Sequence, residues 1–475
     1  MTANQISEAE STLPQNHPEL ALVGVRLLKT SSYAFVVLVA GAALSFGVQL
    51  GTVRLIGAES FGIFAYVISW VTMLAYISTL GLNTSLLRFL PTYRVQGDWT
   101  RAHGVVQFAF RGGTLTGIVL AALAIGVERL VVHAQGELGR TLMIGAIVVP
   151  LMTLRLIGAS ALRAFGAIIV SMLPERILRD SVAFLLLAAL VLGGIAPPDA
   201  VTAMAATLAA AIITLLFIQM FLIKRRPTEL VHAAPCYAIR DWLRPAVSLT
   251  LVMVADTIMS RAGILILGMR NDTLGAGTFA VVCTLAQLAA LPRMALSGLF
   301  APTVSALYAR GDMVALQRLI ARSATLSFTF TLVIALPLMA GAPIILPWFG
   351  PQFASAGSVI IVLVLGQVAA AAAGPQQHLL TMTGHERQGA SLMVAAAAAT
   401  GLGAAVLIIP FGMMGVAVAT TLSMIGWNIA MAIFLSRRLK LRPGLACGGN
   451  PSLKIVTATF SRWGNAVLKL RGSHE

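Results

Sequence analysis

Ionisable side chains within apolar segments are the residues of this chain that could do chemistry. Asp256 lies near the middle of the apolar stretch 245–267, and Arg261 follows five residues later. Arg293 and Arg54 lie near the ends of two further apolar stretches. Because an uncompensated charge is costly in a bilayer, such residues face a partner or a water-filled cavity. The arginines could bind an anionic group, and the carboxylate could take up a proton or a cation.

The spacing of Asp256 and Arg261 argues against a pair within one helix. Five residues correspond to a rotation of about 140°, so the two side chains leave the helix on different faces. One interpretation makes Asp256 the coupling-ion residue of a transporter. The other makes it half of a structural ion pair with an arginine of a neighbouring helix. The sequence leaves both interpretations open.

Weaker polar residues recur at helical spacing in three apolar stretches. Side chains three, four or seven residues apart share one face of a helix. Such stripes can line a polar cavity, or they can pack helices against one another. The residues predicted to line a cavity are Ser45 and Gln49 in the first stretch, Tyr76 and Asn83 in the second, and Gln367 and His378 in the tenth.

No enzymatic or metal-binding pattern stands out in the sequence. There is no Gly-rich phosphate-binding loop ending in Lys-Ser or Lys-Thr, and the seven histidines form no His-Glu-x-x-His pattern. The three cysteines show neither metal-ligand nor disulfide spacing. We therefore expect a membrane transporter and not an enzyme, with no cofactor and no metal. A proton or sodium gradient is the energy source that such a protein would use.

The composition requires a membrane protein. Of 475 residues, 58% are hydrophobic and only 11% are charged. A helix needs about 20 apolar residues to cross the hydrocarbon core, and long unbroken apolar runs exclude a barrel. We predict an all-α polytopic membrane protein with twelve transmembrane helices, at about 33–55, 62–82, 104–126, 141–162, 174–195, 200–222, 245–267, 275–299, 323–347, 357–382, 389–409 and 413–435.

The net charge of +16 is explained by membrane topology without invoking nucleic acid. Lys and Arg residues concentrate in alternate loops, and Arg179 is assigned to one of these loops. By the positive-inside rule the basic loops are cytoplasmic, and an even number of spans then places both termini there. Residues 1–25 lack a signal-peptide pattern. The basic residues that fall in loops on the opposite side are Arg54, Arg129, Arg140 and Arg270.

A segment near the N-terminus recurs in the second half of the chain. The sequence Gly-Ile-Phe-Ala-Tyr-Val of 62–67 returns as Gly-Thr-Phe-Ala-Val-Val at 277–282. Each copy is followed by a tyrosine and then a Gly-Asp pair, which ends at Asp98 and at Asp312. We therefore predict two parallel repeats of six helices, related by a pseudo-twofold axis along the membrane normal. The acid Asp256 and two of the arginines belong to the second repeat, which is where we expect the site.

The charged loop between the repeats sets the predicted domain boundaries. In the last segment, apolar residues recur every three or four positions from Val456 to Leu470. This pattern predicts an amphipathic helix on the membrane lipid, and a disordered basic tail is the alternative. The segments are a cytoplasmic N-terminal tail at 1–28, an N-lobe at 29–222, a cytoplasmic linker at 223–244, a C-lobe at 245–436 and a basic tail at 437–475.

Five segments, in order along the chain, carry a resemblance to a known family. They are 53–62, the pair 80–82 and 87–91, 348–353, 379–384 and 412–420. The third reads Trp-Phe-Gly-Pro-Gln-Phe and the last begins Gly-Met-Met-Gly-Val. Together they resemble the polysaccharide-transporter (Wzx-like) flippases of the multidrug/oligosaccharidyl-lipid/polysaccharide exporter superfamily. The similarity runs over about residues 30–435.

This resemblance implies a MATE-like fold, with two six-helix lobes around an alternating-access cavity. The implied substrate is an undecaprenyl-diphosphate-linked oligosaccharide, flipped across the bacterial inner membrane for exopolysaccharide, capsule or O-antigen lipopolysaccharide. Glycosyltransferases and a polysaccharide polymerase are the implied protein partners. The family's diphosphate-binding arginines point to Arg261 first, then to Arg54 and Arg293. Many relatives have an acidic residue where this chain has Ser260, which places ion coupling at Asp256 in question.

A cation-coupled multidrug antiporter of the same superfamily is the alternative function. Cavities for drug cations favour acidic and aromatic linings, because a cation is attracted to carboxylates and to ring faces. In this chain the arginines within the spans (Arg155, Arg261 and Arg293) outnumber the acid Asp256. The sequence therefore favours an anionic substrate.

Overall fold

The structure is a computed structural model that describes residues 39–132, 135–309 and 311–445. Within these ranges the chain is almost entirely helical and contains no β-strand. The predicted all-α architecture is confirmed for this part of the chain. The N-terminal tail at 1–28 and the amphipathic helix predicted from Val456 to Leu470 lie outside the described residues.

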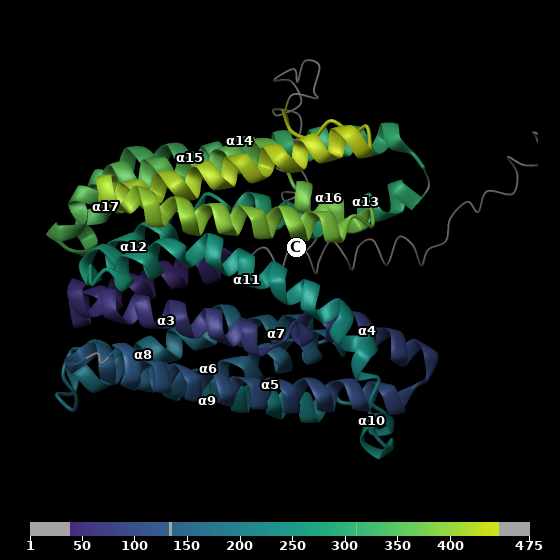
Figure 1. Cartoon of the computed structure of the whole chain (residues 1–475), viewed down its shortest axis with the longest axis horizontal. Coiled ribbons are helices and arrows are strands. Elements are labelled where there is room, and N and C mark those ends of the chain that lie inside the picture. The colour runs from purple at the N-terminus through teal and green to yellow at the C-terminus, as the bar shows by residue number, and fades with distance from the viewer. Residues whose placement is uncertain (1–38, 133–134, 310, 446–475) are drawn as a thin grey trace, which may run out of the picture.

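The N-lobe forms the lower half of the view in Figure 1. Two predicted spans are interrupted here: the second breaks between α3 and α4, and the fifth contains a π-helical segment, η2. The helices are Val39–Ile56, α3 (Ala58–Ser78), α4 (Leu82–Gln96), α5 (Trp99–Val127), which continues into η1 (Glu128–Val132), α6 (Gly136–Ala164), α7 (Ile168–Leu173), η2 (Pro174–Leu178), α8 (Arg179–Leu192) and α9 (Ala200–Arg225).

The C-lobe forms the upper half, and α11 crosses between the two lobes (Figure 1). Two predicted spans break in this lobe as well, the eighth between α12 and α13 and the tenth between α15 and α16. The helices are α10 (Thr228–His232) in the linker, α11 (Ile239–Met269), α12 (Thr273–Leu288), α13 (Leu291–Ala309), α14 (Met313–Ile345), the 3-10 turns η3 (Leu346–Phe349) and η4 (Pro351–Ala356), α15 (Gly357–Ala373), α16 (Gln376–Met382) and α17 (Glu386–Arg438).

The last helical element contains two of the predicted spans. With 53 residues, α17 would be about 80 Å long if straight, far more than the roughly 30 Å of a hydrocarbon core. It is not straight, because Gly412 has the non-helical angles φ 54° and ψ −135°. Within the described residues, nine helical segments are long and apolar enough to span a membrane, with α17 taken as one of them. The count of twelve spans stays a prediction.

The predicted repeat has the same local structure in both lobes. Gly97 and Gly311 have φ of 70° and 72°, a left-handed conformation that suits glycine. The next residue caps the following helix in each case. Asp98 Oδ1 accepts a hydrogen bond from the backbone N–H of Arg101 at 3.0 Å, and Asp312 Oδ1 accepts one from Ala315 at 2.8 Å. The Gly-Asp pairs therefore start α5 and α14 in the same way.

The first glycines of the two repeat segments lie against each other. A methyl group added at Gly277 would lie 2.9 Å from the Cα of Gly62, and one added at Gly62 would overlap the backbone carbonyl of Thr273. Backbones can approach this closely only where side chains are absent. Equivalent positions of the two repeats thus meet where α3 crosses α12, at the left of Figure 1.

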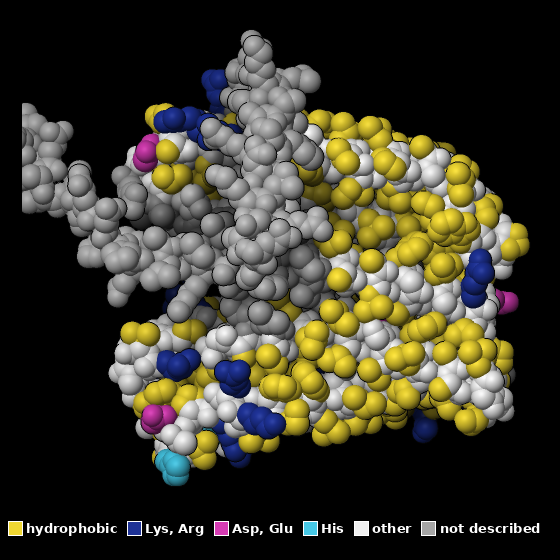
Figure 2. Space-filling model, turned by 180° about the vertical axis from the view of Figure 1, so that it is seen from behind, with side chains coloured by type: hydrophobic (Ala, Val, Ile, Leu, Met, Phe, Trp, Pro, Cys, Tyr) yellow, Lys and Arg dark blue, Asp and Glu magenta, His cyan; other side chains and the backbone are white. Residues whose placement is uncertain are grey.

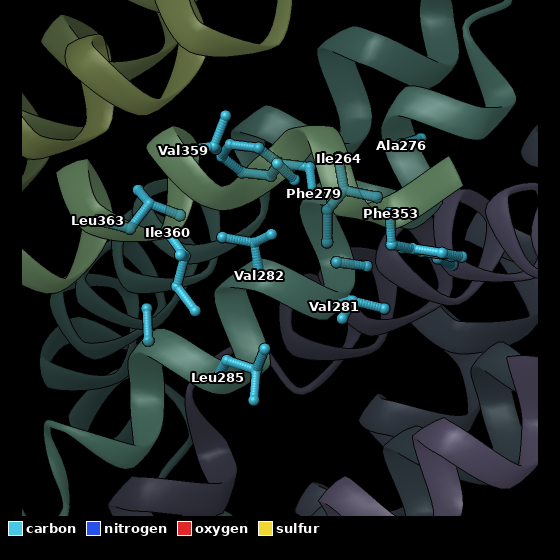
Figure 3. Close-up of a cluster of buried hydrophobic side chains, with 14 of the residues drawn as sticks. Ile264, Ala276, Phe279, Val281, Val282, Leu285, Phe353, Val359, Ile360 and Leu363 are labelled. Atoms are coloured by element: carbon cyan, nitrogen blue, oxygen red, sulfur yellow. The ribbon is translucent and has the colours of Figure 1, made fainter. Parts of the chain in front are cut away.

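A large buried cluster seals the lobes together around this crossing. It includes Val53 and Phe61 from the N-lobe and Phe279 and Phe353 from the C-lobe. Figure 3 shows part of it, where the apolar side chains of α12 meet those of α15. At the other end of the bundle, separate clusters form in each lobe, and Trp242 of α11 belongs to that of the N-lobe.

The surface follows the charge asymmetry of the sequence. Figure 2 shows a broad apolar surface, with Lys and Arg side chains gathered mainly at one end. We call this the basic end, and it holds the exposed residues Lys224–Arg226, Arg240, Arg244 and Arg437–Arg438. The Gly62–Gly277 crossing lies towards the opposite end, since α3 and α12 begin there.

We expect Gly62→Ala to destabilise the protein by about 1–3 kcal/mol, because the added methyl group overpacks the crossing. The matched control is Gly126→Ala in α5, whose added methyl group would meet nothing within 4 Å. This control should melt at or slightly above the wild-type temperature. Thermal melting of the purified proteins in detergent measures the difference. Equal melting of the two variants would show that the backbones do not touch at Gly62.

Candidate functional site

Three of the predicted polar residues come together around a fourth, Arg293. The guanidinium of Arg293, on α13, donates a long hydrogen bond of 3.4 Å from Nη2 to Oε1 of Gln367 on α15. It also interacts electrostatically with Asp256 on α11 and with His378 on α16. Four separate helices thus each contribute one side chain to this group, which we call the Arg293 cluster.

Helix breaks place two members of the Arg293 cluster. The chain leaves α12 in a turn at Ala289–Ala290, and Arg293 is the third residue of α13. Gly374, with φ 79°, separates α15 from α16, and His378 lies in the first turn of α16. Discontinuous helices of this kind form substrate and ion sites in transporters, since the break frees backbone groups and polar side chains within the bilayer.

The carboxyl-bearing residue of this cluster is accessible although it lies in mid-helix. Asp256 is exposed, and its carboxylate interacts electrostatically with Arg293 of α13. An exposed acid that faces a cation of the same bundle is expected on the wall of a cavity, not on a lipid-facing surface. Asp256 is therefore expected to be in contact with water.

A second group, the Arg261 cluster, joins the two lobes. Arg261 on α11 interacts electrostatically with Tyr76 on α3, with Cys283 on α12, and with Arg179 and Asp180 at the start of α8. Nε of Arg179 lies 2.6 Å from Oδ1 of Asp180, which is a short, charge-assisted hydrogen bond.

Buried Arg155 on α6 adds a third cation to the Arg261 cluster. Only 2% of Arg155 is exposed, and it interacts electrostatically with Asp180. The described members therefore include three arginines and one carboxylate. In a low-dielectric interior this excess of positive charge attracts an anion. Because Arg261 belongs to the C-lobe and the other two arginines to the N-lobe, such an anion would contact both lobes.

The sequence analysis counted Arg155 among the arginines within the spans but did not propose it for the site. Cys283, Arg179 and Asp180 are the members that it did not single out as candidates at all. Arg179 was expected in a cytoplasmic loop, but the structure places it half-buried at the first position of α8, directly after the π-helical segment η2. A charged pair inside the apolar stretch 174–195 was the available signal. This signal was weak because the pair lies close to the end of the stretch, where the residues could equally belong to a loop.

Arg54 has a different environment from the other candidate arginines. Its side chain is exposed, and its Nε donates a hydrogen bond of 2.8 Å to the backbone carbonyl of Trp348 in η3. Close by, the rings of Phe46 and Phe349 meet edge to face at 5.6 Å. Arg54 thus bridges the two lobes near the end opposite the basic end, and it belongs to neither cluster.

The remaining candidates lie on the N-lobe side. Nδ2 of Asn83, in the first turn of α4, lies 3.4 Å from the sulfur of Met253 on α11. Ser45 and Gln49 are half-buried on the first helix. The buried Oε1 of Gln49 has no hydrogen-bond partner among the described residues. These three residues are near the lobe interface or on the helix that leads to it, and none of them has a charged partner in the part of the chain that the structure describes.

Comparison with known proteins supports the architecture. A model of the family described as polysaccharide biosynthesis protein matches residues 27–308. An inward-facing multidrug resistance MATE family transporter of the MOP superfamily superposes with a TM-score of 0.71 at 16% identity, covering 86% of this chain and 98% of its own. A MOP superfamily transporter from Pyrococcus furiosus Vc1, described as having a binding pocket of reverse polarity that suggests a different function, gives 0.57 at 17% identity, with 87% and 95% covered. No curated protein matches the sequence. The predicted MATE-like fold is confirmed.

A double-mutant cycle tests the Arg293 cluster. Neutralising either Asp256 or Arg293 alone removes the attraction between the two side chains but keeps the other charge in the interior. The double variant Asp256→Asn/Arg293→Gln should therefore lose less free energy of unfolding than the sum of the losses in the two single variants. We expect a coupling energy of at least about 0.5 kcal/mol from thermal melting. The control cycle pairs Asp256→Asn with Arg54→Gln. Arg54 is a suitable control because it donates its hydrogen bond to Trp348, outside the Arg293 cluster. Additive effects in both cycles would show that Asp256 and Arg293 do not interact.

Proposed function

Because the chain belongs to the polysaccharide biosynthesis protein family, we propose that it is a transporter that flips a lipid-diphosphate-linked oligosaccharide across the bacterial inner membrane. The carrier would be undecaprenyl diphosphate, and the oligosaccharide would serve a surface polysaccharide. The observation that carries the proposal is the Arg261 cluster, in which arginines from both lobes interact with the carboxylate of Asp180 among the described residues.

The charge of the cluster suits a diphosphate. Arginine presents a planar fork of N–H donors that can bind two phosphate oxygens at once, and the pairing strengthens as water is excluded. In the proposed cycle Asp180 holds the arginines in place while the site is free of substrate. The diphosphate then competes with Asp180 for Arg179, Arg155 and Arg261. An anion that contacts arginines of both lobes draws the lobes together around it.

The other parts of the substrate need separate routes. The polyprenyl tail can remain in the bilayer, since its transfer into a polar interior would lose the hydrophobic free energy of its hydrocarbon surface. The sugars need a polar path with hydrogen-bonding groups. Tyr76, Asn83, Gln49 and Ser45 are the N-lobe residues that we propose along this path.

The closed seam supports our assignment of the structure to one state of the proposed cycle. The Gly62–Gly277 crossing and its surrounding cluster close the bundle away from the basic end. Likeness to an inward-facing transporter, with a TM-score of 0.71, supports the same assignment. With the basic end in the cytoplasm, we propose that this state receives substrate from the inner leaflet and that opening of the seam releases it to the outer side.

Asp256 is our proposed coupling residue. A proton or a sodium ion on the Asp256 carboxylate would remove its attraction for Arg293 and free that guanidinium for a new partner. Exchange between the two states would link the ion gradient to movement of α11 against α13. Asp256→Asn mimics the protonated acid, so we expect transport in this variant to lose its dependence on pH, measured in vesicles at several external pH values. Normal transport with unchanged pH dependence would remove Asp256 from coupling.

A cation-coupled multidrug antiporter is the second candidate function. The observation in its favour is the structural likeness to a multidrug resistance MATE family transporter. Against it stands the excess of arginine over acid in the Arg261 cluster, which would repel a drug cation. Glycosyltransferases that build the oligosaccharide and a polymerase that uses it are the partners that the proposed function implies.

The direct test replaces the chromosomal copy with variants and measures surface polysaccharide and lipid-linked intermediates. We expect Arg261→Gln and Arg179→Gln to lower export at least roughly tenfold, since each removes a charge-assisted contact to the diphosphate. Arg54→Gln is the matched control, because its guanidinium is engaged by Trp348 away from the cluster. It should export within about twofold of wild type.

Two outcomes would overturn the proposal at different levels. Unchanged polysaccharide and intermediates on deletion of the whole chain would reject the flippase function. Normal export by both cluster variants, in a strain where deletion abolishes it, would reject the Arg261 cluster alone as the diphosphate site.

A further inference from the structure

A hollow lies at the basic end of the N-lobe, apart from both charged clusters. It has a volume of about 210 Å³ and is formed by α5, the end of α6, α9 and α10. Its polar lining residues are His103, Gln219 and Arg226. None of its lining residues belongs to the Arg293 or Arg261 cluster. The hollow therefore has no part in the site described above.

The walls of this hollow are mostly apolar, and its cations are at the rim. Phe110, Phe165 and Leu230 are among the apolar lining residues. Arg226 is exposed at the C-terminal cap of α9, directly after Lys224 and Arg225. The apolar part of α9 ends at this point. We therefore expect the C-terminal end of α9 to lie at the depth of the lipid headgroups. An anionic group with attached hydrocarbon would suit such walls and such a rim.

His103 is held in a defined tautomer at the wall. Its Nδ1 lies 2.6 Å from the backbone carbonyl oxygen of Ala233. A carbonyl can only accept, so Nδ1 carries the hydrogen. Nε2 has no hydrogen-bond partner among the described residues. His103 thereby adds a polar side chain to the lining beside Arg226.

A shallow groove continues from the hollow towards the bilayer interior. The two share Phe110, and the groove of about 400 Å³ runs between α5 and α6, past Arg111 and Leu115 to Ile118. Ile118 follows Phe110 by eight positions, which corresponds to about 12 Å along α5. Leu115 and Ile118 are 65% and 53% exposed, so the groove presents a hydrocarbon surface below a basic rim.

From this continuity we infer that the hollow and groove form a binding site for one anionic phospholipid of the surrounding leaflet. The phosphate contacts Arg226 and His103, and an acyl chain lies along α5 over Leu115 and Ile118. Free phosphate is the other source of the same anion, but it would leave the apolar walls and the groove unused. A lipid held here would connect α10, in the linker between the lobes, to the N-lobe at α5 and α9.

Adjacent arginines provide the matched test. Arg225 and Arg226 are both exposed at the end of α9, but only Arg226 lines the hollow. Delipidated full-length protein in detergent is titrated with short-chain phosphatidylglycerol, and bound lipid is counted by native mass spectrometry. Arg226→Gln should raise the dissociation constant roughly tenfold, as for loss of one charge-assisted hydrogen bond. Arg225→Gln should change it by less than about twofold.

A second variant tests occupancy of the hollow without changing any charge. Val231 is 46% exposed and lines the hollow, so Val231→Trp should fill it without repacking the interior, and it should abolish tight binding. Val95→Trp, at a residue that is 89% exposed and outside the hollow, is its control and should bind as wild type. Elution volume and melting temperature verify that each variant is folded.

Four results would overturn the inference. Equal loss on substitution of Arg225 and Arg226 would indicate diffuse attraction to a basic surface. Normal binding by Val231→Trp would show that the hollow is not occupied. Displacement of the lipid by millimolar inorganic phosphate, or equal binding of short-chain phosphatidylcholine, would show that the site does not select an anionic phospholipid.

Discussion

The contact of α3 with α12 at Gly62 and Gly277 is the constraint on which the arrangement of the lobes depends. Each backbone occupies the space where the other helix would need a Cβ atom, so neither helix can shift sideways without opening a gap. Apolar side chains of both lobes fill the space around this crossing. The seam is therefore closed mainly by shape and by burial of apolar surface, and the hydrogen bond from Arg54 to the backbone carbonyl of Trp348 adds one polar contact between the lobes at the same end.

Interrupted helices have a related role further from the seam. In each lobe the second predicted span breaks, at Leu80–Gly81 in the N-lobe and at Ala289–Ala290 in the C-lobe. Gly81 lies against the backbone carbonyl of Ala246 in α11, so the break in the N-lobe is packed on the helix that crosses between the lobes. The break in the C-lobe delivers Arg293 to its cluster. The duplication thus supplies the same irregularity twice, and at the third position after the break the C-lobe has Arg293 where the N-lobe has Thr84.

The sequence was sufficient for the features that depend on local pattern. Apolar runs predicted the helices, and the Gly-Asp pairs predicted equivalent turns, which the caps at Asp98 and Asp312 now explain. Helical phase already indicated that Asp256 and Arg261 do not pair within α11, and the structure places them in different clusters. The sequence could not predict which side chains pair between helices. The interactions of Arg179 and Asp180 with Arg261 depend on how α8 packs in the bundle, which no local periodicity encodes. The bridge from Arg54 to Trp348 depends on the same kind of tertiary contact.

Because α11 carries one member of each cluster, it links the two charged groups mechanically. Asp256 and Arg261 are about 7.5 Å apart along the axis of α11 and belong to clusters with different partners. The start of α11 is fixed to the N-lobe by the indole N–H of Trp242, which donates to the hydroxyl of Tyr93 at 3.0 Å. Its later turns pack against α17 of the C-lobe. A change of charge at Asp256 would alter its electrostatic attraction to Arg293 on α13 and so could displace α11. A rigid helix transmits such a displacement to Arg261, about 1.4 turns away. In the proposed cycle, occupancy of the ion site and the strength of diphosphate binding would be coupled through α11, with no direct contact between ion and substrate.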